Sequence, residues 1–127
     1  MTAVCEAISR RDLAAALSIC GRVVPRRALA EVYQSVSLAA GAAEATDGEL
    51  RVSVPIPYDG EPILLPFARL EALTRACTGE QLEIDSEDGQ ATIRAGGGRW
   101  RLPTVAHSEW PEVTGRERRQ MVPVARI

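Results

Sequence analysis

The sequence has little of what marks membrane, secreted or metal-binding proteins. No apolar run approaches the length of a membrane span, and the first residues form no basic and then apolar leader. The three cysteines, Cys5, Cys20 and Cys77, are odd in number and have no CxxC or CxxH spacing, which argues against a disulfide framework or a zinc site. We therefore expect a soluble cytoplasmic protein without a membrane partner, in which the cysteines are small buried thiols.

Catalytic motifs are also lacking. His107 is the only histidine, and no second motif completes a triad or a metal site around it, so we interpret it as a surface-loop residue. The glycines at 96–98 lead into a strand-like segment without a GK[ST] motif, which excludes a phosphate-binding loop. Trp100 alternates with Arg99 and Arg101 and is expected to pack in the core rather than to stack on bases. The sequence thus predicts neither an enzyme nor a cofactor.

Lysine is absent as well, so all fifteen cationic side chains are arginines. The formal net charge of −2 argues against a general nucleic-acid binder. However, residues 9–27 hold five arginines and one acidic residue, Asp12, whereas residues 80–88 hold five acidic residues and no cation. This segregation predicts one basic surface on an otherwise acidic protein.

What the sequence does contain is enough apolar material for one domain, since 46% of its 127 residues are hydrophobic. A first helix is predicted over residues 9–23, with Ser9 as its N-cap. Its apolar side consists of residues at helical spacing, which are Leu13, Leu17, Cys20 and Val24. Its opposite side carries small residues between two cations, namely Arg11, Ala15, Ser18 and Arg22.

A second helix is predicted to begin at Pro66 and to end before Gly79. Its apolar residues are Phe67, Leu70, Leu73 and Cys77, and its outward row is Ala68, Ala72 and Arg75. The alternation at 32–38, 50–54 and 81–85 predicts strands, and tight turns at 88–89 and 96–98 lead to two more. This order predicts an α+β domain whose two helices share one face of an antiparallel sheet.

Four segments, in their order and spacing, resemble motifs of the bacterial sliding clamp family, the β subunit of DNA polymerase III. ATDGEL at 45–50 is similar to a Thr-Asp-x-Glu strand pair with Gly48 inserted, and LPFARL at 65–70 is similar to a VPA helix start. WRL at 100–102 and EWPEV at 109–113 are similar to the closing strand and its Asp-Phe-Pro motif. The resemblance covers about residues 4–113 and is greatest to the first domain of the family. It implies a DNA-clamp domain at 1–113 with outer sheets and two inner helices, then a basic C-terminal tail or terminal edge strand at 114–127.

In that family, six such domains close into a ring whose helices line the hole and whose sheets form the outer wall, so that duplex DNA is encircled. The resemblance therefore implies a processivity factor in DNA replication. It aligns loop 21–27 with a family loop that places an arginine near DNA, with Arg26 as the best match. Sparse arginines among small residues would attract phosphates without gripping the duplex at one register. The implied DNA-binding residues are Arg11, Arg22, Arg26, Arg27 and Arg75.

The family carries three domains in each chain, whereas this chain has one, so a ring needs about six copies joined head to tail through exposed edge strands. The segment 121–127 is loosely similar to the family's C-terminal stretch beside its partner-peptide groove. It either contributes Val122, Val124 and Ile127 to a groove for a DNA polymerase or clamp loader, or forms a terminal edge strand, where Pro123 is tolerated.

Two other functions stay open from the sequence. The first is a clamp-fold interaction module that does not encircle DNA and that regulates a polymerase or another clamp. The second is a sequence-reading helix-turn-helix drawn from residues 11–37, although Pro25 and the strand-like 32–38 leave too little second helix.

Overall fold

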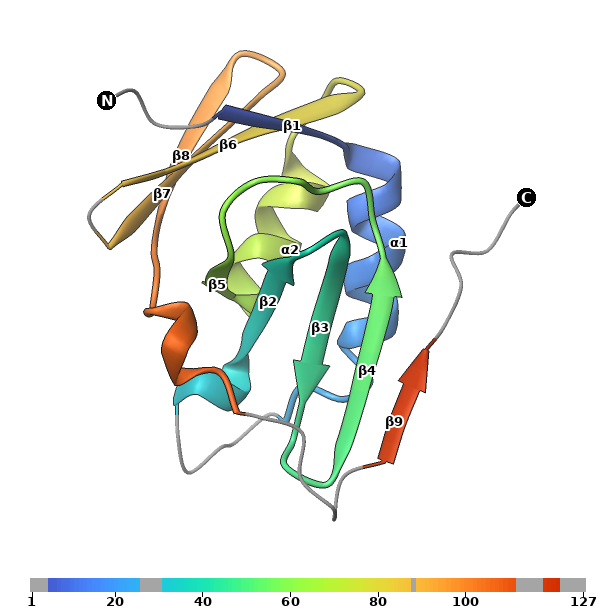
Figure 1. Ribbon diagram of the computed structural model, residues 1–127. Helices are drawn as coiled ribbons and strands as arrows, with labels where there is room; N and C mark the ends of the chain where they lie inside the picture. Colours follow the sequence, from blue (N-terminus) through green and yellow to red (C-terminus); the bar gives the residue numbers. More distant parts are fainter. Residues whose placement is uncertain (1–4, 26–30, 88, 112–117, 122–127) are drawn as a thin grey trace.

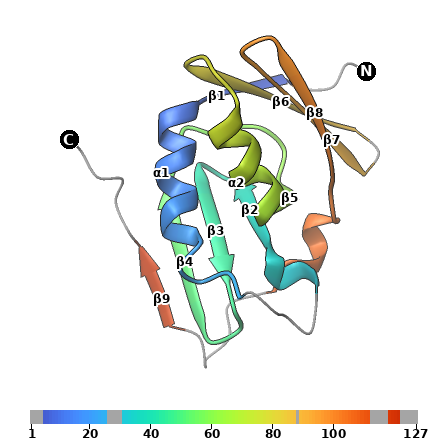
Figure 2. The same ribbon diagram turned by 180° about the vertical axis from the view of Figure 1, so that it is seen from behind.

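Two β-sheets and two α-helices make up the architecture (Figure 1). The structure is a computed structural model, and it describes residues 5–25, 31–87, 89–111 and 118–121. The helices lie together against one face of the larger sheet, and the smaller sheet lies across the end of the helices at which β1 enters α1 (Figures 1 and 2).

The smaller sheet has four antiparallel strands in the order β1-β6-β7-β8. Their bounds are Cys5–Ser9 for β1, Gln81–Glu87 for β6, Gln90–Ala95 for β7 and Gly98–Pro103 for β8. Between β7 and β8 the backbone φ is 53° at Gly96 and 84° at Gly97, which are the positive values of a type I′ hairpin turn. The predicted meander after residue 81 is therefore confirmed, with Asp88 outside the described residues.

The larger sheet has five strands in the order β5-β2-β3-β4-β9. Their bounds are Ile63–Pro66 for β5, Ser35–Ala39 for β2, Ala42–Thr46 for β3, Leu50–Pro55 for β4 and Arg118–Met121 for β9. The first four pair antiparallel, whereas β9 runs parallel to β4.

The strand predicted at 50–54 is confirmed as β4, but the one predicted at 32–38 is partly wrong. Residues Glu31–Gln34 form a 3-10 helix, η1, and the strand begins at Ser35. Residues four apart share a face in a strand and in a helical turn alike, so the spacing of Val32 and Val36 does not distinguish the two. Because a short 3-10 turn and a strand follow α1 in the described residues 31–39, the helix-turn-helix alternative is wrong.

Helix α1 comprises Arg10–Cys20, and Ser9 caps it as predicted, since the Ser9 hydroxyl accepts a hydrogen bond of 3.3 Å from the Asp12 amide. The helix ends at Cys20, three residues before the predicted end at residue 23, and Gly21 is its C-cap. A Cβ atom at Gly21 would lie 2.9 Å from the ring of Phe67, so glycine is what allows α2 to approach the end of α1. Helix α2 comprises Phe67–Ala76 with Pro66 as its N-cap, so the helix predicted to begin at Pro66 and to end before Gly79 is confirmed. Strand β5, which leads into it, was not predicted.

One core lies among the helices and both sheets, and the smaller sheet contributes Ile8, Leu82 and Ile93 to it. Leu13 and Leu17 of α1 and Leu70 of α2 are buried together with alternate residues of β2, β3 and β4, which are Val36, Leu38, Ala43, Ala45, Val52 and Val54. Cys20 and Cys77 are buried free thiols, as predicted, whereas the side chain of Cys5 lies outside the described part. Burial raises the pKa of Cys20 to about 12, so this thiol stays protonated and unreactive.

The opposite face of the larger sheet is polar, yet it is also buried. Its residues include Ser35, Ser37, Thr46, Arg51 and Ser53. The chain that leaves β8 crosses this side, where Val105 forms a bridge with Leu64 and a short 3-10 helix, η2 (His107–Glu109), precedes Trp110. We call residues 104–111 the strap. Hydrogen bonds from the strap satisfy polar groups that a bare sheet would offer to water.

Candidate nucleic-acid interface

The outward side of α1 is the flat basic row that the sequence predicted. Arg11, Ala15, Ser18 and Arg22 are all exposed, while Leu13, Ala16, Leu17 and Cys20 are buried on the other side. Arg22 lies just beyond the helix, in the turn where its amide bonds to the Ile19 carbonyl at 3.1 Å. Neighbouring Arg10 does not belong to the row, because its Nε donates to the Gly79 carbonyl at 2.7 Å.

The outward side of α2 continues this surface. Ala68, Ala72 and Arg75 are exposed, as predicted. Arg69 is exposed too and was missed, because the sequence argument followed a single row with a spacing of three or four residues. Arg75 forms an ion pair of 3.0 Å with half-buried Glu71, which lowers its contribution to the local positive charge.

The two helices lie side by side, so their outward rows form one surface, which we call the helix face (Figure 2). Its exposed arginines are Arg11, Arg22, Arg69 and Arg75, and the side chains between them are small. On both helices every acidic residue is at least partly buried. Such a face attracts phosphate at long range and offers few directed contacts with which to fix a register.

The remaining predicted site residues lie outside the described part of the chain. Arg26 and Arg27 belong to loop 26–30, and Val122, Val124 and Ile127 follow β9. Their assignments to DNA and to a partner groove stay predictions.

The surroundings of His107 do not form a catalytic site. The prediction of a surface-loop residue is partly confirmed, because His107 lies in the connecting strap, but its ring is partly buried and its Nε2 lies 2.7 Å from the Ser37 hydroxyl oxygen. Ser37 is only 3% exposed in the middle of β2, so no substrate reaches the hydroxyl as a nucleophile. The contact holds the strap on the sheet. Among the described residues, no group of three or more His, Cys, Asp or Glu side chains could hold a metal ion.

The contact of His107 with Ser37 predicts a pH dependence of stability. Burial lowers the pKa of His107 from its ordinary value of 6.5, and the negative charge of Glu44 acts in the opposite direction. A lowered pKa in the folded state stabilises the protein above pH 6.5, and this contribution is lost as the pH falls below 6.5 toward the lowered value. We expect the melting temperature of wild type to fall more steeply in that window than that of His107→Gln. If the melting temperatures of wild type and His107→Gln fell equally with pH in this window, His107 would be excluded as the titrating group.

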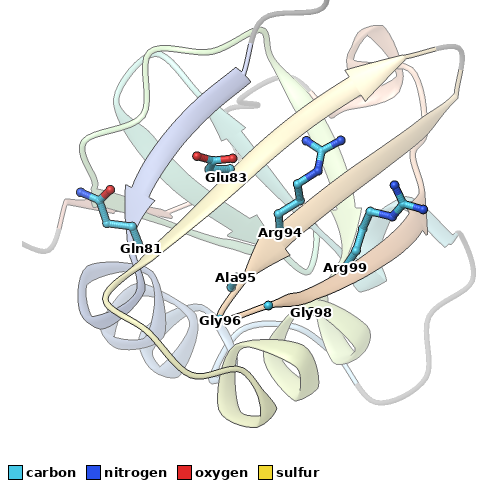
Figure 3. A pocket seen from close by; sticks show the side chains of 8 residues that line it. Gln81, Glu83, Arg94, Ala95, Gly96, Gly98 and Arg99 are labelled. Carbon is cyan, nitrogen blue, oxygen red and sulfur yellow. The ribbon is translucent and has the colours of Figure 1, made fainter.

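A separate hollow lies on the exposed side of the smaller sheet. It has a volume of about 390 Å³ and is lined by charged side chains of three strands and by the glycine turn (Figure 3). Arg94 lies between Glu83 of β6 and Arg99 of β8 in the strand register, and its Nη1 is 2.8 Å from Asp85. Mixed charge of this kind gives no preference for phosphate, so the hollow does not extend the basic helix face.

The described part of the chain contains no helix long and apolar enough to cross a membrane. No protein-family model matches the sequence, and no curated protein matches it significantly. Solved structures do match its fold. A DnaN sliding clamp (DNA polymerase III subunit beta) from Pseudomonas aeruginosa, bound to griselimycin, superposes with a TM-score of 0.77 at 23% identity, over 88% of this chain and 33% of that chain.

Caulobacter crescentus pol III beta gives a TM-score of 0.80 at 22% identity, over 88% of this chain and 32% of that chain. The DNA polymerase sliding clamp from Bacillus subtilis gives a TM-score of 0.77 at 15% identity, over 89% of this chain and 34% of that chain. This chain has the fold of one sliding-clamp domain.

The clamp-domain fold confirms the predicted α+β class with its antiparallel sheets and two helices. The chain spans about a third of the length of each of these solved clamps. The helix face is therefore a surface of a clamp-domain fold.

Proposed function

We propose that this protein is a single-domain subunit of a homo-oligomeric ring that encircles duplex DNA and acts as a processivity factor. The observation that carries the proposal is the helix face, in which two adjacent helices of a clamp-domain fold present exposed arginines among small residues. The phosphates of duplex DNA inside a ring are attracted by positive charge on the inner surface of the ring. The ring can slide along the duplex only if that surface makes few directed contacts with it.

The small size of the chain determines how many copies a ring needs. One domain cannot surround a duplex, so a ring of this chain needs about six copies in a closed head-to-tail arrangement. Such a ring performs no chemistry, works where DNA is replicated in the cytoplasm, and serves a DNA polymerase or a clamp loader as its protein partner. If Val122, Val124 and Ile127 contribute to a groove for that partner, each subunit carries one such groove.

We expect two results from wild-type protein. Its mass in solution, measured by light scattering, should be about six times the 13.7 kDa of the chain. At the same salt concentration, the protein should stay longer on a closed circular duplex than on the same duplex cut once, because a ring on cut DNA can also slide off the end. Equal retention on circular and cut DNA would contradict encirclement. A monomeric or dimeric mass at all concentrations would favour the interaction module that does not encircle DNA.

A further inference from the structure

The exposed face of the smaller sheet carries its positive and negative charges in two separate rows. Alternate residues of a strand lie on the same face of its sheet. On β6, three successive alternate residues of this face are acidic, and we call them the acidic row: Glu83, Asp85 and Glu87. On β8, two alternate residues of the same face are arginines, and we call them the basic row: Arg99 and Arg101. Strand β7 lies between the two rows.

The strand register sets the two rows level with each other. Glu83 of the acidic row and Arg99 of the basic row are both register partners of Arg94 on β7. One step further along the face, Asp85 and Arg101 are level in the same way, because both are partners of one β7 residue. Neighbouring strands are about 4.8 Å apart, so the rows run side by side at roughly 10 Å. The face is therefore divided lengthwise into an acidic half and a basic half.

Most of these charges are not neutralised within the described part of the subunit. Among the described residues, Asp85 alone of the two rows forms an ion pair, with Arg94 at 2.8 Å. Arg94 also lies directly opposite Arg99, and like charges in that position are destabilising. A face that served solubility alone would have its charges of both signs interspersed. The separate rows therefore indicate that a surface with the opposite pattern covers this face.

We propose that this face is a docking surface for the same face of a second copy of this chain. A partner must carry a basic row opposite the acidic one and an acidic row opposite the basic one, and the face itself has this pattern. A two-fold axis along β7, between two sheets that face each other, places β6 of each copy over β8 of the other. The acidic row of each copy then faces the basic row of the other.

This two-fold arrangement also keeps the level of each charge. Rotation about an axis parallel to the strands shifts no residue along them, so Glu83 faces Arg99 of the second copy. Asp85 likewise faces Arg101 of the second copy. The strands of the two sheets run in the same direction, as in aligned sheet packing, where the strand directions lie within about 30° of each other. A two-fold axis across the strands would instead place the two acidic rows over each other.

The position of Arg94 near the axis is compatible with this contact. Each Arg94 guanidinium is neutralised in part by Asp85 of its own chain. The hollow of about 390 Å³ lies beside it, with Glu83 on one side and Arg94 and Arg99 on the other (Figure 3). This space leaves room for the two Arg94 side chains where the sheets approach each other.

The contact is expected to be weak and sensitive to salt. Four strands about 4.8 Å apart, with six residues of about 3.4 Å each, give a face of roughly 400 Å². Two such faces bury roughly 800 Å², which is less than the about 1,200 Å² of a stable complex. The contact uses one sheet face, whereas the proposed ring uses strand edges and the proposed DNA interface uses the helices. It is therefore independent of the proposed ring, and between rings it joins one ring to another.

Reversing the sign of one row at a time tests the proposal in the full chain. The acidic-face variant is Arg99→Glu with Arg101→Glu, and the basic-face variant is Glu83→Arg with Glu87→Arg. All four side chains are exposed, and the ion pair on this face is kept.

Wild type should self-associate in sedimentation velocity at about 0.01 M salt, where the Debye length is roughly 30 Å. Each variant alone should associate at least about tenfold more weakly than wild type, because like charges then face each other. An equimolar mixture of the two variants should return to wild-type association, since all facing charges are again opposite. A fluorescent label on the acidic-face variant follows its association in the mixture.

A matched control separates the rows from the net charge. Glu49 and Glu109 are exposed in the turn after β3 and on the strap. Glu49→Arg with Glu109→Arg raises the net charge by four, as the basic-face variant does. This control should self-associate like wild type, and it should not restore association of the labelled acidic-face variant.

Three outcomes would overturn the proposal. They are no salt-dependent association of wild type, no recovery in the mixture of the two variants, and recovery with the control as strong as with the basic-face variant. The ring is judged separately at about 1 M salt, where the Debye length is roughly 3 Å and the contact is screened. A mass of about six chains there, without association at low salt, supports the ring and overturns the contact. A monomer there that pairs at low salt supports the contact without the ring.

Discussion

Replacing Arg11 and Arg22 by alanine should shorten the residence of the protein on closed circular DNA by at least about tenfold at physiological salt. Both side chains are exposed on the helix face, and a ring would present each of them several times to the phosphates. Each lost phosphate contact should also reduce the slope of log affinity against log salt by about 0.9. Retention should depend on salt but not on base sequence, since the helix face offers no dense set of directed contacts.

The folded state should tolerate this change. Exposed substitutions usually alter the free energy of unfolding by less than about 0.5 kcal/mol. Arg11 also lies in the first turn of α1, where a cation is unfavourable to the helix dipole, so its loss is not destabilising there. The melting temperature and the mass in solution should therefore stay those of wild type.

A matched control changes the net charge by the same amount on another face. Gln90 is exposed on β7 of the smaller sheet and Ser108 is exposed on the strap, and Gln90→Glu with Ser108→Glu also lowers the net charge by two. We expect this control to retain circular DNA like wild type. If both double variants lose retention equally, net charge and not the helix face holds the DNA. If neither does, the assignment of Arg11 and Arg22 is wrong.

Replacing Arg51 by methionine should lower the free energy of unfolding by about 3–5 kcal/mol. Arg51 of β4 is 1% exposed, and its Nη1 pairs with the carboxylate of Glu44 at 2.6 Å. Its Nη2 donates to the Pro111 carbonyl at 2.5 Å, and its guanidinium lies 5.8 Å from the centre of the Trp110 ring. Glu44 also accepts a hydrogen bond of 2.7 Å from Trp110 Nε1. Removing Arg51 takes this buried cation away from the mostly buried carboxylate of Glu44 and removes a hydrogen bond to the end of the strap.

Two further variants identify the cause of this loss. In Arg51→Met with Glu44→Gln no uncompensated charge remains, and the amide oxygen can still accept from Trp110, so we expect less than half of the loss. Arg94→Met breaks the more exposed ion pair with Asp85 and should cost less than about 1 kcal/mol. Urea unfolding followed by tryptophan fluorescence measures all three. Equal losses for Arg51→Met and Arg94→Met would show that the buried pair has no special role.

Local pattern was sufficient to predict both helices and most strands. The spacing of Leu13, Leu17 and Cys20 places them on one side of α1, and the resulting burial and the exposure of Arg11 and Arg22 are confirmed. Ser9 caps the helix because its hydroxyl is at the right position in the chain, whatever the rest of the fold does. The glycine turn at 96–97 is likewise a local property, since positive φ favours glycine.

Contacts between distant segments were not predictable in this way. His107 was interpreted as a surface residue, but it lies on Ser37, seventy positions away in the chain. Arg51 alternates with the apolar residues Leu50 and Val52, which is the pattern of an outward strand residue. It is buried by the strap, whose Pro111 is 60 positions further along the chain. Neither partner carries a local signal, because burial of a polar face depends on which segment crosses it.

The sequence by itself determined the elements of this protein, the order of its clamp-like motifs and the charge carried by each helix, because these follow from periodicity and capping within a few residues. Only the tertiary structure decided that the rows of α1 and α2 form one face, that Arg69 belongs to it, and that β9 pairs parallel to β4. These are relations between segments far apart in the chain, set by how two sheets and two helices bury their apolar sides together.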